Sequence, residues 1–307
     1  MRVYHSIEEF SAVNPVVTVG MFDGVHAGHR SILRQLEVSK HQFAGESVLI
    51  TFWPHPRQFF GRMQGFSILS TIEEKLQLLS DSGLDVCLVL PFTNEFAQLC
   101  PEEYIQTILC KGVGAKKVII GYDHKYGKDG RGSYGLMQQY GKQCGFAVEQ
   151  IKAFTIDSQA ISSTKIRNLL ADGHIEEANA YLSYSYFVNG VVVPGSQIGR
   201  TIGFPTANVH IDSELKALPA PGVYAGYAEC CGVKYKSVIN IGTNPTVKQC
   251  APLSIEAHLI DFQGDLYKKN LKISFLKRLR DEQRFSSLDE LKQAIEQDVN
   301  SIRDLDL

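Results

Sequence analysis

The stretch VVTVGMFDGVHAGHR, residues 16–30, decides the fold of the first half of the chain. An apolar, β-branched run opens it, a turn bounded by glycines follows, and His26 and His29 then stand three residues apart. A buried strand, a tight turn and a helix start in this order are typical of the first unit of a parallel α/β sheet. Because a helix N-terminus presents free N–H groups and the positive end of its dipole, the stretch predicts an anion site.

Three hypotheses compete for the two histidines. Metal binding needs a third or fourth protein ligand, and Asp23 is the only local candidate. Histidines at a helix start are also often packed or solvated without any ligand. The preceding strand, the glycines that permit close backbone approach and the helix that follows together favour a phosphate clamp, to which imidazole N–H groups add donors.

The alternation of strands and helices continues through the first half. Further apolar runs occupy residues 47–53, 85–92 and 116–121, with helical patterns between them. Thr71 and Glu74 form a capping box at the start of one helix, TIEEKLQLLSDSG. Its apolar face is expected to hold Ile72, Leu76 and Leu79. This alternation predicts an α/β domain with a Rossmann-like parallel sheet.

The pattern changes near residue 183. Short apolar segments interrupted by glycine and proline then predict an antiparallel β-barrel. The last segment, SSLDELKQAIEQDVNSIRDL, opens with a capping box of Ser287 and Glu290 and predicts a closing helix. We therefore expect two domains, residues 1–182 and residues 183–307, as the length of 307 residues also suggests.

Composition narrows the classes of partner. Lys and Arg number 31 against 33 Asp and Glu, a net charge of -2 that favours small-molecule partners over nucleic acid or a membrane surface. The N-terminus MRVYHSIEEFSAV carries charges where a signal peptide needs an apolar run, so a cytoplasmic protein is expected. Seven cysteines without a CxxC pair indicate reduced thiols. The oligomeric state is open, with a monomer favoured.

A second fragment, ISSTKIR (161–167), has residue types that could bind the same phosphate group as His26 and His29. Ser163 and Thr164 stand at an expected helix N-terminus, and Arg167 lies one turn further on. Considered without the rest of the sequence, the fragment is explained by ordinary N-capping. The combination of HxGH after the first strand with ISSTKIR resembles the HxGH nucleotidylyltransferases, and together with FWPHP and PFTNEFAQLCPEEYI it resembles the FMN adenylyltransferase module of bacterial FAD synthetases. The residues this resemblance places at phosphate are Gly20, Phe22, Asp23, His26, Gly28, His29, Ser163, Thr164 and Arg167.

The string GSQIGRTIGFPTAN (195–208) is the most distinctive of the second half. Its glycines free backbone N–H groups for phosphate, and Thr206 and Asn208 offer oxygens suited to Mg²⁺, although a glycine-rich hairpin in a barrel is an open alternative. The string resembles the riboflavin kinase signature, as do PGVYAG, NIGTNPTV (240–247), IEAHLIDF and RLRDEQRFSSLDEL. With both halves, nearly all of the chain resembles the bifunctional riboflavin kinase/FMN adenylyltransferase family.

The resemblance implies roles for single residues. Glu256 matches the general base that takes the proton of the riboflavin 5′-hydroxyl, whereas a strand-face Glu paired with Lys is the structural alternative. His29 and Arg167 match groups that neutralise the triphosphate and the leaving pyrophosphate. The phosphate residues implied in the second half are Gly195, Gly199, Gly203, Pro205 and Thr206. The flavin residues implied are Asp123, Asn208, Arg280 and Phe285.

The sequence also departs from the family pattern. His124 and Tyr126, in the loop GYDHKYGKDGRG, stand where the family commonly has Phe, Lys268 replaces a usual Gly, and LSYSY lacks a usual Gly-Arg-Pro. The expected reaction is riboflavin to FMN to FAD, with Mg²⁺ and one ATP per step. Two rivals remain: an adenylyltransferase for another substrate with the barrel as a binding module, and a flavin-responsive regulator without activity.

Overall fold

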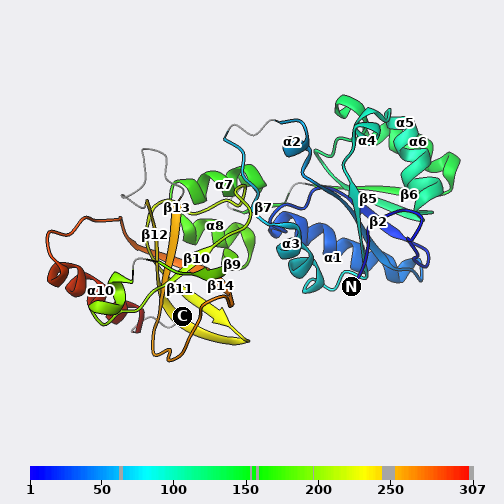
Figure 1. Ribbon diagram of the computed structural model, residues 1–307. Coiled ribbons are helices and arrows are strands. Elements are labelled where there is room, and N and C mark those ends of the chain that lie inside the picture. The colour runs from blue at the N-terminus through cyan, green and yellow to red at the C-terminus, as the bar shows by residue number, and fades with distance from the viewer. Residues whose placement is uncertain (62–64, 153, 157–158, 196, 244–252, 304–307) are drawn as a thin grey trace. The chain divides into compact units, whose positions relative to one another are not determined.

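The computed structural model describes residues 1–61, 65–152, 154–156, 159–195, 197–243 and 253–303 (Figure 1). The chain divides into two compact units, Met1–Ser163 and Thr164–Leu307. Each unit is described by itself below.

A six-stranded parallel sheet forms the centre of the first unit, as predicted. Its strands are β1 (Arg2–Tyr4), β2 (Val16–Val19), β3 (Ser47–Trp53), β4 (Val86–Pro91), β5 (Lys117–Gly121) and β6 (Ala147–Ile151). They lie in the order β1-β4-β3-β2-β5-β6, and every pairing is parallel. The strand order reverses direction at β2 and β5, so the crevice at their carboxyl ends is where such sheets bind ligands.

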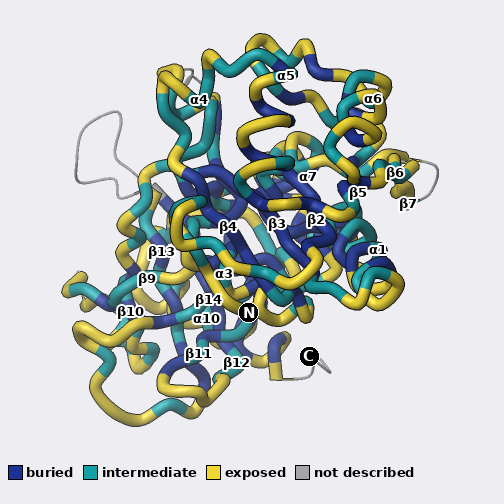
Figure 2. Tube along the Cα trace, turned by 90° about the vertical axis from the view of Figure 1, so that its right-hand side faces the viewer, coloured by how far each residue is buried: buried dark blue, intermediate teal, exposed yellow. Residues whose placement is uncertain are grey.

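Helices connect the strands of this sheet. They are α1 (Ala27–Gln42), α2 (Pro56–Phe59), α3 (Ile72–Ser80), α4 (Asn94–Gln98), α5 (Pro101–Tyr104), the π-helix Ile105–Gly112, the 3₁₀ turn Lys128–Gly130 and α6 (Tyr134–Cys144). Figure 2 shows β2, β3 and β4 as a buried centre, because helices cover a sheet whose strands are apolar on both faces. A two-stranded ribbon, β7 (Thr155–Ile156) with β8 (Gln159–Ala160), follows the sheet.

The buried face of α3 differs from the expected one. The capping box of Thr71 and Glu74 is present, but the buried residues are Glu74, Lys75, Leu78 and Leu79, while Ile72 and Leu76 are only partly buried. Of the three residues predicted to form the apolar face, only Leu79 is fully buried. The prediction was wrong for Ile72 and Leu76 because α3 turns a lysine and a glutamate inward, each 2% exposed.

A closed six-stranded barrel forms the second unit, also as predicted. Its strands are β9 (Phe187–Val193), β10 (Ala207–His210), β11 (Gly222–Cys230), β12 (Val233–Thr243), β13 (Leu253–Leu259) and β14 (Asn270–Arg280). Going around the barrel, their order is β10-β13-β12-β11-β14-β9, and all pairings are antiparallel.

The described part of the second unit also contains helices. They are α7 (Ser163–Ala171), α8 (Ile175–Leu182), the short α9 (Ile198–Thr201) and α10 (Leu288–Arg303). The α10 helix confirms the predicted C-terminal helix, and Val299 and Ile302 pack with Val223 and Val238 of the barrel. Half of the predicted capping box is present, because Ser287 Oγ accepts from the Glu290 N–H at 3.2 Å, but the Glu290 carboxylate accepts from Ser286 N and Oγ instead of from Ser287 N. The α8 residue Asn179 donates to the carbonyl oxygen of Phe275 on β14 at 2.9 Å, so α8 belongs with the barrel, whereas the predicted boundary follows it.

Candidate functional site

The loop between β2 and α1 forms the first candidate site. His26 caps α1, and its Nδ1 accepts a hydrogen bond from the backbone N–H of His29 at 3.3 Å. This bond requires Nδ1 of His26 to be unprotonated. The glycines of the motif make room for rings: a Cβ at Gly28 would lie 3.2 Å from the His26 ring, and one at Gly20 would lie 3.1 Å from the Phe22 ring. The N-terminus of a 16-residue helix therefore meets two imidazoles, as predicted.

His29 lies in the middle of a stack of three rings. Its centroid is 3.6 Å from that of His26 and 4.4 Å from that of Phe22, with the ring planes within 19° of parallel. Among the described residues its buried Nδ1 has no hydrogen-bond partner. Burial, and then the nearby His26 and Lys75, hold the pKa of His29 well below its usual value. The ring is therefore neutral at physiological pH and supplies a hydrogen-bond donor rather than a charge.

Asp23 anchors the loop to a neighbouring segment. It is 3% exposed, and its carboxylate accepts hydrogen bonds from the backbone N–H groups of Leu69 at 2.9 Å and Ser70 at 3.1 Å. Ser163 Oγ donates to the backbone carbonyl of Asp23 at 3.0 Å, which brings one residue of ISSTKIR to the histidine loop. Thr164 and Arg167 follow on α7 in the second unit, and their contact with the same phosphate stays a prediction.

A cavity of about 580 Å³ opens at the carboxyl edge of the sheet. Its wall is built from the ends of several strands, and its residues include Gly20, Phe52, Pro56, Phe60, Phe92, Phe96, Tyr104, Asp123, His124 and Tyr126. Aromatic rings dominate, and a flat aromatic ligand suits such a wall. Among these residues, only Gly20 and the loop after β5 were predicted from the sequence as parts of a site. The stretches around Phe52, Phe92 and Phe96 contributed only to the family resemblance, and no role was predicted for their rings, for Phe60 after α2 or for Tyr104 of α5.

Two polar atoms in this wall lack a partner. Within the part of the chain that the structure describes, Oη of Tyr104 and Nε2 of His124 are buried and accept or donate no hydrogen bond. Burial lowers the pKa of His124 to about 4, although Asp123 opposes the shift, so its ring is neutral. Unpaired buried polar atoms are costly, and a ligand with polar ring edges would satisfy them.

The second unit gathers predicted residues around Glu256. Thr206 Oγ1 donates to Glu256 Oε2 at 3.0 Å, and Asn208 stands opposite Glu256 in the β10–β13 register. A Cβ at Gly195 would overlap the side-chain amide of Asn208, so only glycine permits this approach. One carboxylate, one hydroxyl and one amide are thereby placed together at the barrel.

The remaining predicted glycines shape the loop before β10. Gly203 has a φ of 91°, which favours glycine, and the backbone N–H of Phe204 donates to the Gly199 carbonyl at 2.8 Å. The carbonyl of Pro205 accepts from Nδ1 of His258 at 2.9 Å. Residues 244–247 of the predicted NIGTNPTV signature lie outside the described residues.

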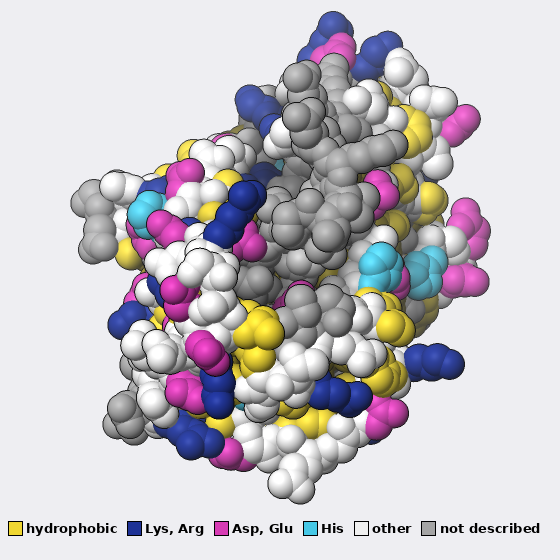
Figure 3. Space-filling model, turned by 60° about the vertical axis from the view of Figure 1, so that its left-hand side comes forward, with side chains coloured by type: hydrophobic (Ala, Val, Ile, Leu, Met, Phe, Trp, Pro, Cys, Tyr) yellow, Lys and Arg dark blue, Asp and Glu magenta, His cyan; other side chains and the backbone are white. Residues whose placement is uncertain are grey.

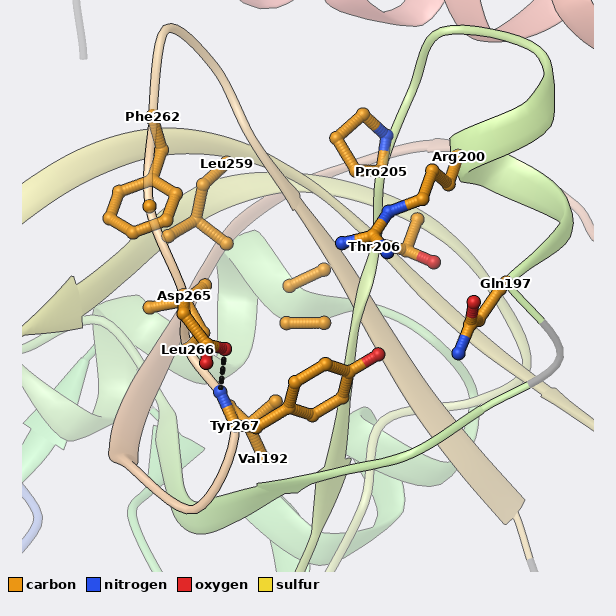
Figure 4. Close-up of a pocket in the computed structure, with 13 residues that line it drawn as sticks. Val192, Gln197, Arg200, Pro205, Thr206, Leu259, Phe262, Asp265, Leu266 and Tyr267 are labelled. Carbon is orange, nitrogen blue, oxygen red and sulfur yellow. Dashed lines mark hydrogen bonds between the residues drawn. The ribbon is translucent and has the colours of Figure 1, made fainter.

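A pocket of about 320 Å³ lies beside Thr206 (Figure 4). Its polar side chains include Gln197, Arg200, Asp265 and Tyr267, and its apolar floor includes Val192, Ala207, Ala257, Leu259 and Phe262. In Figure 4 the guanidinium of Arg200 and the ring of Tyr267 extend into the same space. Sequence reasoning missed both. Lys268, next to Tyr267, has a φ of 63°, which is the left-handed region in which the usual glycine of the family fits without strain.

Arg280 is held by the C-terminal helix. Its Nη2 donates to Asp298 Oδ2 at 2.8 Å, its Nε donates to the same carboxylate at 3.2 Å, and Asp298 is 6% exposed. The guanidinium carbon lies 5.7 Å from the ring centroid of Phe285, so two of the four predicted flavin residues lie together. The Asp298 carboxylate neutralises the charge of Arg280. The planar guanidinium therefore offers a surface for packing rather than a free charge.

Comparisons with known proteins agree with this division. The FAD synthetase family model matches residues 10–165, and the riboflavin kinase model matches residues 182–305. The bifunctional riboflavin kinase/FMN adenylyltransferase of Escherichia coli (strain K12) is 35% identical over 307 residues, covering 99% of this chain and 96% of the relative. The corresponding protein of Bacillus subtilis (strain 168) is 36% identical over 300 residues, covering 96% and 93%.

A solved structure, titled as a macrolide-efflux protein from Streptococcus pneumoniae, has a TM-score of 0.87 and 27% identity, covering 99% of this chain and 98% of that one. Within the described residues, the chain has no helix of the length and apolarity that crossing a bilayer requires. Two family models in sequence order and full-length relatives at 35% and 36% identity agree with a chain of an α/β unit followed by a barrel. The chain belongs to the bifunctional riboflavin kinase/FMN adenylyltransferase family.

Proposed function

We propose how the two units divide the two activities of the family. The second unit phosphorylates riboflavin to FMN with ATP, and the first unit joins FMN to the AMP part of a second ATP, which yields FAD and pyrophosphate. The observation that carries the proposal is that each unit has a pocket and a polar cluster of its own: the histidine loop with an aromatic cavity, and Glu256 with Thr206 beside a barrel pocket.

In the kinase step, Glu256 takes the proton of the riboflavin 5′-hydroxyl. That oxygen then forms a bond to the γ-phosphorus of ATP while the bond from this phosphorus to ADP breaks. A neutral hydroxyl needs such a base, and the hydrogen bond from Thr206 holds one carboxylate oxygen of Glu256 in place. Arg200 and Tyr267 are suited to the nucleotide, since a guanidinium pairs with phosphate and a phenol ring packs on a base.

The oxygens of Thr206 and Asn208 fit Mg²⁺. A hydroxyl and an amide beside the Glu256 carboxylate form the hard oxygen set that this ion prefers. When bound there, Mg²⁺ would neutralise charge on the phosphates of ATP. This chain's residues would hold the ion and keep the nucleotide oriented.

In the adenylyl transfer, the attacking group is the phosphate of FMN. It is already anionic, so this site needs donors and no base. Amide N–H groups at the start of α1 and the neutral ring of His29 would bind the phosphates of ATP and stabilise the leaving pyrophosphate. The aromatic cavity has the size and the wall for the isoalloxazine ring.

We infer further that the protein acts as a cytoplasmic monomer on small molecules, without nucleic acid or membrane partners. Each pocket is lined by residues of one unit alone. On the face drawn in Figure 3, acidic and basic described side chains are interspersed rather than gathered by sign, in line with the net charge of -2.

Stability of the first unit should fall as the pH drops below 6.5. His124 has a folded pKa of about 4, so it takes up a proton in the unfolded chain before it does so in the folded one. Its contribution is complete above 6.5 and is lost as the pH falls toward 4, by at most about 1.4 kcal/mol per pH unit. Urea unfolding followed by Trp53 fluorescence at pH 7.5, 6.5 and 5.5 measures this slope. His124→Phe should reduce this slope, whereas His29, whose pKa is also lowered by burial, keeps its own contribution to it; an equal slope in both proteins contradicts the assignment.

A product assay tests the proposed function. Purified protein is incubated with riboflavin alone, FMN alone, and each with ATP and Mg²⁺, and products are separated by chromatography. We expect FMN and then FAD from riboflavin, and FAD with pyrophosphate from FMN. FAD formation from FMN without FMN formation from riboflavin would favour an adenylyltransferase whose barrel is only a binding module. No product from either substrate would favour the flavin-responsive regulator.

A further inference from the structure

Lys75 is a buried cation that the mechanism above does not use. It lies on α3, is 2% exposed, and has neither a hydrogen bond nor an ion pair with any residue that the structure describes. Its contact is with a ring: Nζ lies 5.8 Å from the centroid of Trp53. Burying an ammonium without an anion is strongly unfavourable, so its retention calls for a partner.

The ammonium lies at the carboxyl edge of the sheet. Trp53 is the last residue of β3, and the loop with Asp23 and His29 follows β2 at the same edge. Lys75 is close enough to these two residues for its charge to act on them: it helps to lower the pKa of His29, and Asp23 partly offsets the lowering of the pKa of Lys75 by burial. The contact with Trp53 places the cation at the same edge of the sheet as the N-terminus of α1.

Asp23 does not provide the missing partner. Its carboxylate is hydrogen-bonded to the N–H groups of Leu69 and Ser70, and it makes no ion pair with Lys75. His29 also has a buried ring nitrogen without a partner among the described residues. A helix N-terminus, an unpaired ammonium and an unpaired imidazole nitrogen thus occur together, and an anion would satisfy all three.

We propose that Lys75 binds a phosphate group of the adenylyl-transfer substrates, beside the N-terminus of α1. The inference rests on the proposed function of the first unit. Two sources offer this chemistry, the polyphosphate of ATP with its product pyrophosphate and the single phosphate of FMN. The position next to His29 favours the polyphosphate.

Inorganic pyrophosphate is the direct probe, because Trp53 is the only tryptophan of the chain. Titration of the full-length protein with pyrophosphate should change Trp53 fluorescence in a saturable way as Lys75 shifts from the ring to the anion. In Lys75→Met the affinity for pyrophosphate should fall about tenfold or more, the loss expected for a charge-assisted hydrogen bond. An affinity unchanged from the wild type overturns the proposal.

Lys40→Met is the matched control. Lys40 lies near the end of α1 and pairs with Asp85 at 2.9 Å, at the amino edge of the same sheet. This variant removes the same charge from the same unit, but away from the proposed anion, so its pyrophosphate affinity should stay near that of the wild type. An equal loss in both variants would indicate a general effect of charge and overturn the assignment to Lys75.

Kinetics then separate the two phosphate sources. A higher KM for ATP in FAD formation, with the KM for FMN unchanged, supports contact with the polyphosphate; the reverse result assigns Lys75 to the FMN phosphate. If Lys75→Met does not fold, Lys75→Gln replaces it and is judged by the same two outcomes. If the wild type forms FAD and the variants bind and react like it, only this inference fails. If the wild type forms no FAD from FMN, the proposed function fails instead.

Discussion

Glu256→Gln should lower the rate of FMN formation by about 10²- to 10⁴-fold, the usual contribution of a general base. Glutamine has nearly the shape of glutamate, and its amide oxygen can still accept the hydrogen bond that Thr206 donates to Glu256 at 3.0 Å. The variant therefore removes the proton acceptor and leaves the contact that orients it. The measurement is the initial rate of FMN formation from riboflavin and ATP.

Adenylylation of supplied FMN provides the internal control for this variant. Glu256 lies on β13 of the barrel, whereas the histidine loop and its cavity are built by the first unit. FAD formation from FMN should therefore match that of the wild type. Equal losses of both activities would contradict separate sites, and full kinase activity in Glu256→Gln would return Glu256 to the alternative of a structural strand residue.

Local pattern predicted much of this protein. The strand, turn and helix around His26 follow from β-branched residues, glycine and a helix start within 15 residues, and the parallel sheet follows from their repetition. The barrel followed from short segments broken by glycine. In each case the deciding interactions lie close in sequence, where period and turn chemistry can be recognised.

The features that the sequence did not predict depend on contacts between segments that are distant in the sequence. The aromatic cavity takes Phe60 from the connection between β3 and β4, and Phe92 and Tyr104 from the connection between β4 and β5, and nothing in their spacing indicates that they meet. Lys75 sits in a helix whose pattern suggests a solvated lysine, and only the packing of α3 buries it. Arg280 was implied as a flavin residue by the family resemblance alone, and nothing in its neighbourhood in the sequence indicates that Asp298 of α10, 18 positions later, pairs with it.

His29→Ala should lower the other activity. FAD formation from FMN should fall by about 10²- to 10³-fold, the usual loss for one preorganised donor to a developing charge, while FMN formation from riboflavin stays near the wild-type rate. Alanine also leaves a gap in the stack of Phe22, His29 and His26, so a loss of packing could imitate a loss of chemistry.

His29→Phe separates the two causes. Phenylalanine fills the space between the rings of Phe22 and His26, whose centroids lie 4.4 Å and 3.6 Å from that of His29. It has no ring N–H group that could donate to phosphate. If donation matters, His29→Phe should unfold in urea like the wild type, form FMN normally and lose FAD formation as severely as His29→Ala. If it instead forms FAD at the wild-type rate, the ring acts only by packing, and the donors must come from the α1 N-terminus and the other phosphate residues alone.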